Sequence, residues 1–368
     1  MKFLIVTFTT LYCFNSLDAR NIAPDNDELI LVHAIIRHGN RTPDDEIYPG
    51  NPYGNEKYYE PYGFAQLTNE GKRTEYKLGQ ALRNRYGSFL DKEYHRNDID
   101  PRTTNVPRTK MSLLLVLAGL YPPTGSLLWN RALKWQPIPY NYYEHDKELS
   151  SQFVCVNYKR MYKSLLSSEK IQAQILVYKD VYEYLSDHTN TTVSTPNDVA
   201  DIFLELKAQR DYGYQLENWT SKYFPYPMEN ITKDMYYAMT NTTSLKKIIS
   251  GFLIKKIIED SDKKIRETLQ PPQRKLFIYS AHEKNIATLL LTLGVFDDRI
   301  PAYGSYILVE VHRVNRTHGL KFYYQNYIEV EPTLVTIPGC ASFCPLTQFA
   351  QLMKEYVPED EDCELKND

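Results

Sequence analysis

The sequence predicts an α/β protein in which a mixed sheet carries helices on both faces and a mainly helical lobe is inserted into the chain. Two apolar runs, 29–36 and 276–280, read as buried strands, and each leads into a segment that contains a histidine. Between these runs, residues 155–258 show helical periodicity and few strand signals. Strands that alternate with helical patterns are typical of α/β folds.

The first predicted strand ends in the most informative motif of the chain, Arg37-His38-Gly39-Asn40-Arg41-Thr42-Pro43. In open α/β sheets, ligands bind outside the carboxyl ends of the strands. The guanidinium fork pairs with phosphate, and a histidine between two such arginines is well placed to attack phosphorus. Gly39 has no Cβ, so we expect it to let a ligand approach the backbone. A solvated basic loop is the alternative, but charged residues rarely end a buried strand so densely.

A second candidate site segment follows a predicted helix. Thr68 is expected to cap that helix, which runs to about Tyr86. Residues 100–112 are then rich in threonine and asparagine, and a helix carrying 113–120 is expected after them. A helix N-terminus and a guanidinium can together hold an anion. From spacing alone, Arg108 in this segment is equally well explained as an anion ligand or as an exposed arginine.

The middle of the chain is expected to form the helical lobe. Plausible helices cover 171–185, 199–206 and 245–258. Just before them, His145-Asp146 lies in a polar run with no strand ahead of it, and we interpret this pair as solvated loop.

The strand predicted at 276–280 repeats the first architecture. It leads into His282 and Glu283, and a helix with an apolar face is expected over 284–293. Taken alone, a capping glutamate and a core histidine would explain the pair. Further on, 306–312 and 322–328 alternate around a turn signal, which predicts a hairpin that extends the sheet on an antiparallel edge.

Length and charge limit the class of protein. With 368 residues the chain is long enough for two lobes, and 42% hydrophobic and 24% charged residues are ordinary globular values. The net charge of −3 and the sequence pI of about 6.3 argue against a nucleic-acid binder, which would present a basic face.

The first residues predict export. Lys2 precedes an apolar stretch that runs to about Phe14, which is typical of a signal peptide over residues 1–19 cleaved after Ala19. A membrane anchor is disfavoured because this stretch is too short to span a bilayer, and no later stretch is both long and apolar enough. We therefore expect a secreted, extracellular protein without a membrane partner. Its α/β domain would comprise 20–150 and 259–368, with 151–258 as the inserted helical domain.

Cysteines and sequons agree with export. Cys13 leaves with the signal peptide, and four cysteines remain, which allow three pairings. Cys340 and Cys344 are close enough for a local bridge, which leaves Cys155 with Cys363. A metal site is disfavoured because no histidine lies near Cys340 or Cys344. Glycosylation sequons stand at Asn190, Asn218, Asn230, Asn241 and Asn315.

The motif from Arg37 to Pro43 resembles the signature of the histidine acid phosphatases, branch 2 of the histidine phosphatase superfamily. Further shared segments are Gln66-Leu67-Thr68 with Gly71, Trp135-Gln136-Pro137-Ile138-Pro139 and Ser280-Ala281-His282-Glu283. The resemblance covers nearly the whole mature chain and looks closest to the insect venom acid phosphatases. It implies a phosphoglycerate mutase-like fold, a homodimer, and phosphate monoesters of small molecules or proteins as substrates.

The resemblance also implies a role for each site residue. His38 would be the nucleophile that forms a phosphohistidine, His282 a hydrogen-bond donor to the developing charge, and Glu283 the acid that protonates the leaving alcohol. Arg37, Arg41 and Arg108 would hold the phosphoryl oxygens, so that neither a metal nor a cofactor is required. Because a glutamate must be protonated to act as an acid, activity is expected to favour acid pH.

The sequence departs from the family pattern in three positions. Glutamate stands at Glu283, where aspartate is commoner, and neutral residues stand at Asn105 and Pro107, where acidic residues are frequent. Two alternatives therefore stay open. One is a mutase-like transferase, which the predicted signal peptide and disulfides disfavour. The other is a secreted, catalytically weak protein on the same scaffold that acts by binding.

Overall fold

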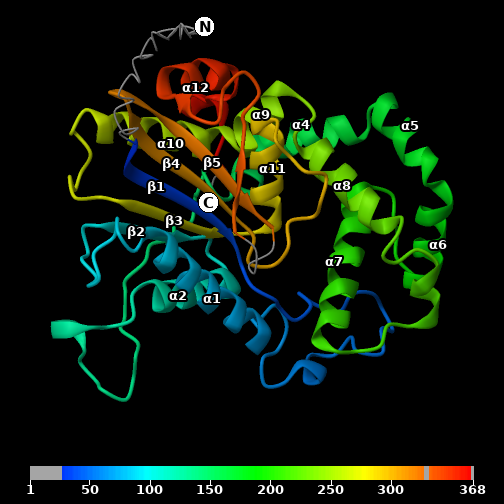
Figure 1. Cartoon of the computed structure of the whole chain (residues 1–368). Coiled ribbons are helices and arrows are strands. Elements are labelled where there is room, and N and C mark those ends of the chain that lie inside the picture. Colours follow the sequence, from blue (N-terminus) through cyan, green and yellow to red (C-terminus); the bar gives the residue numbers. More distant parts are fainter. Residues whose placement is uncertain (1–26, 327–330, 366–368) are drawn as a thin grey trace, which may run out of the picture.

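The computed structural model describes residues 27–326 and 331–365 (Figure 1). The expected signal peptide and Cys13 lie outside the described residues. The strands are β1 Asp27–Arg37, β2 Ile99–Thr103, β3 Leu276–Ala281, β4 Tyr306–Val314, β5 Thr317–Gln325, β6 Thr333–Val335 and β7 Cys344–Pro345. Within the described residues they form one sheet in the order β2-β3-β1-β4-β5-β6, and β7 pairs with β5.

The helices surround this sheet and build a lobe beside it (Figure 1). They are α1 Asn69–Tyr86, α2 Pro107–Leu120, α3 Ser151–Val154, α4 Val156–Leu166, α5 Glu169–Val177, α6 Lys179–Thr189, α7 Pro196–Tyr212, α8 Met228–Met239, α9 Thr243–Ile249, α10 Gly251–Ile265, α11 Glu283–Leu293 and α12 Leu346–Met353. Short 3₁₀ segments are η1 Glu56–Tyr59, η2 Gly125–Leu127, η3 Asn218–Lys222, η4 Lys354–Tyr356 and η5 Asp360–Asp362.

The sheet is mixed, as predicted, and its parallel half brings three strand ends to one edge. β1 and β2 both run parallel to β3, whereas β4 is antiparallel to β1. In this register Arg37 pairs with Ala281, and Thr103 pairs with Ser280. The residues that follow β1, β2 and β3 therefore meet at the same edge.

Alternation along β1 sends side chains to two separate cores, which is why helices cover both faces. Leu31 and Ile35 pack with α10, α11 and α12 on one face. Val32, Ala34 and Ile36 pack with α1 and α2 on the other. Figure 1 shows α1 and α2 below the sheet and α10 and α12 above it.

The helical lobe has a core of its own, built from α6, α7 and α8 around residues such as Leu185, Phe203 and Ile231. The helix predicted over 245–258 is two helices, α9 and α10. They separate at Ser250, and an added Cβ on the next residue, Gly251, would lie 2.0 Å from the Tyr356 carbonyl oxygen of the crossing C-terminal segment. The predicted helix 171–185 is likewise divided into α5 and α6 at Tyr178.

The expected domain division at residue 258 falls inside α10. This helix packs Leu253, Ile254 and Ile257 into the core of the sheet. We therefore propose that the second part of the α/β domain begins with α10, and that α4 to α8 form the inserted lobe.

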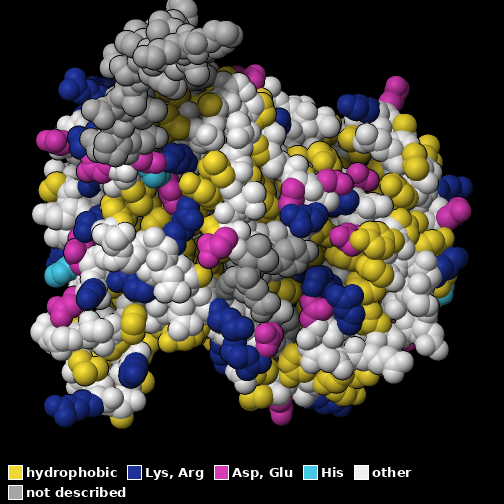
Figure 2. Space-filling model, viewed as in Figure 1, with side chains coloured by type: hydrophobic (Ala, Val, Ile, Leu, Met, Phe, Trp, Pro, Cys, Tyr) yellow, Lys and Arg dark blue, Asp and Glu magenta, His cyan; other side chains and the backbone are white. Residues whose placement is uncertain are grey.

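The structure pairs Cys155 with Cys363 and Cys340 with Cys344, which are the two pairings expected from the sequence. The first bridge joins the start of α4 to the C-terminal segment. Among the described residues, no helix combines the length and apolar character needed to cross a bilayer. Figure 2 shows acidic and basic side chains interspersed over the face in view.

Candidate active site

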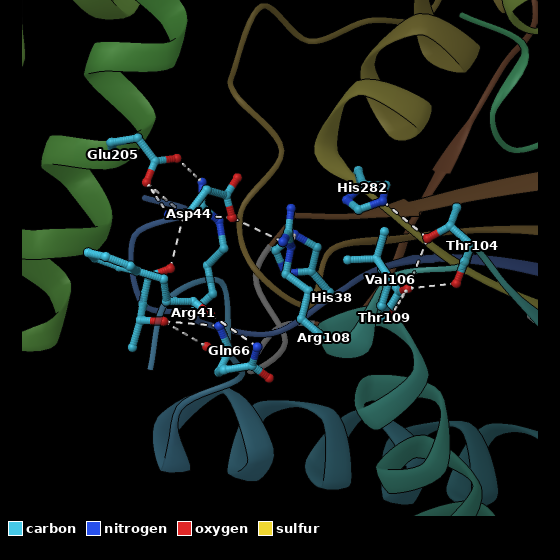
Figure 3. Close-up of polar contacts among 12 residues, drawn as sticks. His38, Arg41, Asp44, Gln66, Thr104, Val106, Arg108, Thr109, Glu205 and His282 are labelled. Atoms are coloured by element: carbon cyan, nitrogen blue, oxygen red, sulfur yellow. Dashed lines mark hydrogen bonds and ion pairs between the residues drawn. The ribbon is translucent and has the colours of Figure 1, made fainter. Parts of the chain in front are cut away.

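The predicted site residues meet at the edge of the sheet where the three parallel strands end (Figure 3). Arg37 is the last residue of β1 and His38 follows it, while His282 and Glu283 follow β3. Arg108 stands at the start of α2, directly after the loop that leaves β2. The rings of His38 and His282 lie 5.4 Å apart between their centroids.

Backbone contacts with the start of α1 fix the loop that carries the motif. An added Cβ on Gly39 would lie 2.5 Å from the Gly71 carbonyl oxygen, and one on Gly71 would lie 2.2 Å from the Asn40 carbonyl oxygen. Thr68 donates its N–H to Asn40 at 2.9 Å and caps α1 through its side chain. Gly39 therefore serves close packing against α1, and the approach of a ligand to its backbone stays a prediction.

His38 is buried and oriented as a neutral nucleophile. Its Nδ1 lies 2.8 Å from the Gly39 carbonyl oxygen, which can only accept, so Nδ1 carries the proton and Nε2 carries the lone pair. Arg108 donates its Nε–H to this Nε2 at 3.2 Å. Burial, together with the charges of Arg108 and Arg37, lowers the pKa of His38 well below 6.5. Both effects favour the neutral ring.

Each of the three site arginines contacts its own carboxylate. Arg41 donates from both terminal nitrogens to Glu205 at 3.0 and 2.6 Å. Arg108 lies 3.0 Å from Asp44, and Arg37 lies 3.7 Å from Glu283. Each positive charge of the cluster is therefore offset by a carboxylate nearby.

Asp44 and Glu205 are the site residues that sequence reasoning missed. Glu205 comes from α7 of the inserted lobe and also accepts the backbone N–H of Asp44 at 2.7 Å (Figure 3). Asp44 lies between Arg108 and Arg41, 3.6 Å from the latter. It supplies the negative charge beside Arg108 that Asn105 and Pro107 do not. Only the position of Asp44, directly after the motif, signalled it in the sequence.

Arg37 is fixed from two sides. One terminal nitrogen donates to the Pro301 carbonyl oxygen, and the guanidinium lies 4.1 Å from the centre of the Tyr303 ring. Its Nε is buried and has no hydrogen-bond partner among the described residues. Arg37 thus keeps donor capacity in a rigid position, which suits an anion ligand.

A chain of hydroxyls orients His282. Thr109 donates to the Val106 carbonyl oxygen at 2.9 Å and lies 2.9 Å from the Thr104 hydroxyl, which lies 3.1 Å from Nε2 of His282 (Figure 3). The Val106 carbonyl can only accept, so the Thr109 hydroxyl donates to it and accepts from the Thr104 hydroxyl. Thr104 can then accept the Nε2–H of His282. Burial and the neighbouring Arg108 lower the pKa of His282 to about 3, so it is a neutral donor.

Glu283 differs from expectation in its charge. Burial raises its pKa, but Arg37, Lys284 and His282 outweigh this effect and lower it to about 2. The carboxylate is ionised in this arrangement, so the expected protonated acid is not what the structure presents. Arg37 offsets the charge of Glu283, and added negative charge near Arg37 would make Glu283 easier to protonate.

The interpretation of His145-Asp146 as solvated loop was wrong for Asp146. His145 is exposed, but Asp146 is buried and accepts from Nε of Arg102 at 3.2 Å. Asp146 also accepts the backbone N–H of Leu149 at 2.8 Å. The pair Arg102–Asp146 anchors this segment to β2 and takes no part in the site.

A pocket of about 220 Å³ opens beside these groups. Four predicted site residues line it, Arg41, Arg108, His282 and Glu283, and we call their part of the pocket the inner side. We call the rest of the lining the outer side, which consists of Asp44, Val106, Gln152, Phe153, Asp201, Leu204, Glu205 and Lys284. Across the described part of the chain, no three His, Cys, Asp or Glu side chains are grouped so that they could hold a metal ion.

Comparison with known proteins agrees with this geometry. The family model described as histidine phosphatase superfamily (branch 2) matches residues 28–330. The chain belongs to this family. Residues from the motif to the end of β5 lie within the match, so the family covers every strand end that builds the site.

Two curated relatives illustrate the similarity. The venom acid phosphatase Acph-1 of Apis mellifera is 35% identical over 340 residues, which cover 91% of this chain and 87% of that protein. The prostatic acid phosphatase of Bos taurus is 30% identical over 380 residues, covering 99% and 96%. The relatives support an enzyme of this family and do not support the alternative of a binding protein.

Solved structures show the same fold at lower identity. The Hafnia alvei phytase in its apo form aligns with a TM-score of 0.66 and 16% identity, covering 94% of this chain and 100% of that chain. The same phytase in complex with myo-inositol hexakis sulphate gives a TM-score of 0.66. These alignments support the phosphoglycerate mutase-like architecture predicted for the histidine phosphatase family.

Proposed function

We propose that this protein is a secreted acid phosphatase that hydrolyses phosphate monoesters through a phosphohistidine on His38. One observation carries the proposal. His38 is buried and neutral, its Nδ1 proton goes to the Gly39 carbonyl, and its Nε2 lone pair faces the guanidinium of Arg108. A phosphoryl group held by Arg108, Arg41 and Arg37 would lie next to that lone pair.

In the first step, a bond forms between His38 Nε2 and phosphorus while the bond from phosphorus to the leaving oxygen breaks. The arginines stabilise the charge on the phosphoryl oxygens, and His282 would donate its Nε2–H to them in place of the Thr104 hydroxyl. In the second step, water attacks phosphorus and gives a proton to the Glu283 carboxylate while the P–N bond breaks, which releases phosphate and restores neutral His38. Covalent catalysis divides one difficult displacement into two easier ones.

The leaving oxygen needs a proton, and Glu283 is the proposed carrier. A bound phosphoryl group brings negative charge to Arg37 and so weakens the interaction that keeps Glu283 ionised. Below a pH of about 6 the monoester is itself a monoanion and brings a proton with it. The acid preference follows from these protons, and the lowered pKa values of His38 and His282 favour the neutral rings that the mechanism needs.

Export and glycosylation belong to the proposal. The predicted signal peptide and the two disulfides support an oxidising compartment. Asn190, Asn218, Asn241 and Asn315 are exposed and Asn230 is half-buried, so all five sequons remain candidates for glycosylation. The similarity to a venom and a prostatic acid phosphatase supports export of this protein. The similarity to the venom enzyme supports the proposal that this protein is a component of venom.

Expression from a secretory host followed by a phosphatase assay tests the proposal. The secreted protein should release phosphate from phenyl phosphate at acid pH without added metal, and inorganic phosphate should inhibit it competitively. The variant His38→Ala should be secreted equally well and be inactive. Absence of turnover in the wild-type protein across pH 3 to 8 would contradict the proposed function.

A further inference from the structure

The outer side of the active-site pocket has a composition that the proposed mechanism does not use. We propose that it is a leaving-group subsite for monoesters of aromatic alcohols that carry no second anionic group. This inference rests on the proposed phosphatase function and adds the substrate class.

The direction of departure places the leaving group in this subsite. In phosphoryl transfer, the attacking and leaving atoms lie roughly in line with phosphorus between them. His38 is buried behind Arg108 and is not among the residues that line the pocket, whereas Arg108, His282 and Glu283 are. A group that departs opposite His38 therefore extends from the inner side of the pocket toward the outer side.

One wall of the subsite is apolar. Phe153 on α3 lines it with 59% of its surface exposed, and Leu204 of α7 and Val106 complete the wall. An exposed phenyl ring at the mouth of a pocket loses water contacts when a second ring stacks on it, which stabilises the complex. The same wall offers little to a polyol, whose hydroxyls would lose hydrogen bonds to water against it.

The charges of the subsite oppose a second anion. Its outer cation is Lys284, and this side chain faces Asp201 at 4.0 Å. Two further carboxylates, Asp44 and Glu205, line the same pocket beside the arginines. A phosphate bound to Arg41 and Arg108 would share these guanidinium groups with the two carboxylates, so less of the carboxylate charge would be offset. An additional phosphate or carboxylate on the substrate would then meet like charges.

The first experiment measures whether Phe153 selects aromatic leaving groups. It compares kcat/KM for phenyl phosphate with kcat/KM for glycerol 2-phosphate in the wild type, in Phe153→Ala and in Trp129→Ala. Trp129 is equally exposed, at 59%, but does not line the pocket. Phe153→Ala should reduce the ratio of the two constants about tenfold, the effect of one lost ring stacking. Trp129→Ala should leave the ratio unchanged, and an unchanged ratio in Phe153→Ala overturns the aromatic subsite.

The second experiment measures charge discrimination with 4-carboxyphenyl phosphate and its methyl ester. The wild type should prefer the ester, and Asp201→Asn should narrow that preference. Comparing the variant's ratio with the wild-type ratio cancels the intrinsic reactivities of the two substrates. If the ratio of kcat/KM for the ester to kcat/KM for the carboxylate is equal in both proteins, the charge argument is overturned.

The phosphatase function and the aromatic subsite can be contradicted separately. Hydrolysis of phenyl phosphate with ratios that the variants do not alter overturns the subsite and leaves the phosphatase function intact. Absence of hydrolysis of every monoester overturns both. Rapid hydrolysis of myo-inositol hexakisphosphate, at a kcat/KM equal to that for phenyl phosphate, would also overturn the subsite.

Discussion

Arg108 donates its Nε–H to Nε2 of His38 at 3.2 Å, the atom that would attack phosphorus. This contact couples the charge of Arg108 to the protonation of the nucleophile. The guanidinium helps to keep the pKa of His38 below its ordinary value, so that the lone pair is available in acid. Phosphate binding and nucleophile activation therefore depend on one arginine.

Replacing Arg108 by glutamine should reduce kcat/KM for phenyl phosphate by about 100-fold, corresponding to about 2.7 kcal/mol of lost charge stabilisation. The pKa of His38 should also rise, since one of the charges that lowers it has gone. More of the ring is then protonated at a given acid pH, and the acid limb of the pH profile should move to higher pH. Arg73→Gln removes an exposed arginine paired with Glu70 and serves as the control. An unshifted acid limb in Arg108→Gln would show that the contact does not tune His38.

Asp44→Asn should tighten inhibition by inorganic phosphate. The Asp44 carboxylate lies 3.0 Å from Arg108 and 3.6 Å from Arg41, where it competes with the phosphoryl oxygens for the same donors. Removing its charge should lower the inhibition constant about tenfold, equivalent to about 1.4 kcal/mol. Asp45→Asn changes the neighbouring exposed residue and should have little effect. Weaker inhibition in Asp44→Asn would mean that Asp44 mainly orients Arg108.

Glu75 should make stability depend on pH. This residue of α1 is fully buried, and neither carboxyl oxygen has a hydrogen-bond partner among the described residues. Burial raises its pKa well above 4.5, and Arg37 offsets this only in part. The folded state therefore holds a proton that the unfolded state releases. The stability due to that proton is fully present below pH 4.5 and is lost as pH rises through the folded pKa, at about 1.4 kcal/mol per pH unit.

The measurement is urea unfolding of wild type and Glu75→Gln between pH 4 and pH 8. The free energy of unfolding should fall less with rising pH in the variant than in the wild type. A pH-independent difference in stability caused by the amide does not affect this comparison. Glu70→Gln, on the exposed side of the same helix, should follow the wild-type curve. Parallel curves for wild type and Glu75→Gln would contradict a protonated Glu75.

Glu283→Gln tests the proposed proton carrier. An alkoxide leaving group needs a proton much more than a nitrophenolate does. The variant should therefore slow hydrolysis of alkyl phosphates by a much larger factor than hydrolysis of p-nitrophenyl phosphate, and its acid preference should weaken. Equal slowing of both substrates would indicate that Glu283 positions Arg37 and that the proton comes from elsewhere.

The sequence predicted the α/β fold, and its patterned strands placed the motif and His282-Glu283 at strand ends. The roles of Arg108, His282 and Glu283 came from the family resemblance. The strand β1 is apolar on both faces, and the motif directly follows it. Partners that come from the lobe were not predictable in this way. Glu205 lies in the ordinary helical pattern of α7, and only the fold brings it within 2.6 Å of Arg41.

The charge of Glu283 could not be predicted for a related reason. Its type and position suggested an acid, but its pKa depends on the distance to Arg37, which local sequence does not contain. The buried state of Asp146 was missed because its partner Arg102 lies 44 residues earlier in the chain. Long-range ion pairs thus account for the errors at both positions.

The most direct test of the account is to trap the covalent intermediate. The enzyme is mixed with phenyl phosphate labelled in the phosphoryl group, quenched in alkali, in which phosphohistidine survives, and digested for peptide mapping. The account predicts label on the peptide that contains His38, lost on acid treatment and absent from His38→Ala. Label on another residue, or turnover of His38→Ala close to that of the wild type, would contradict it.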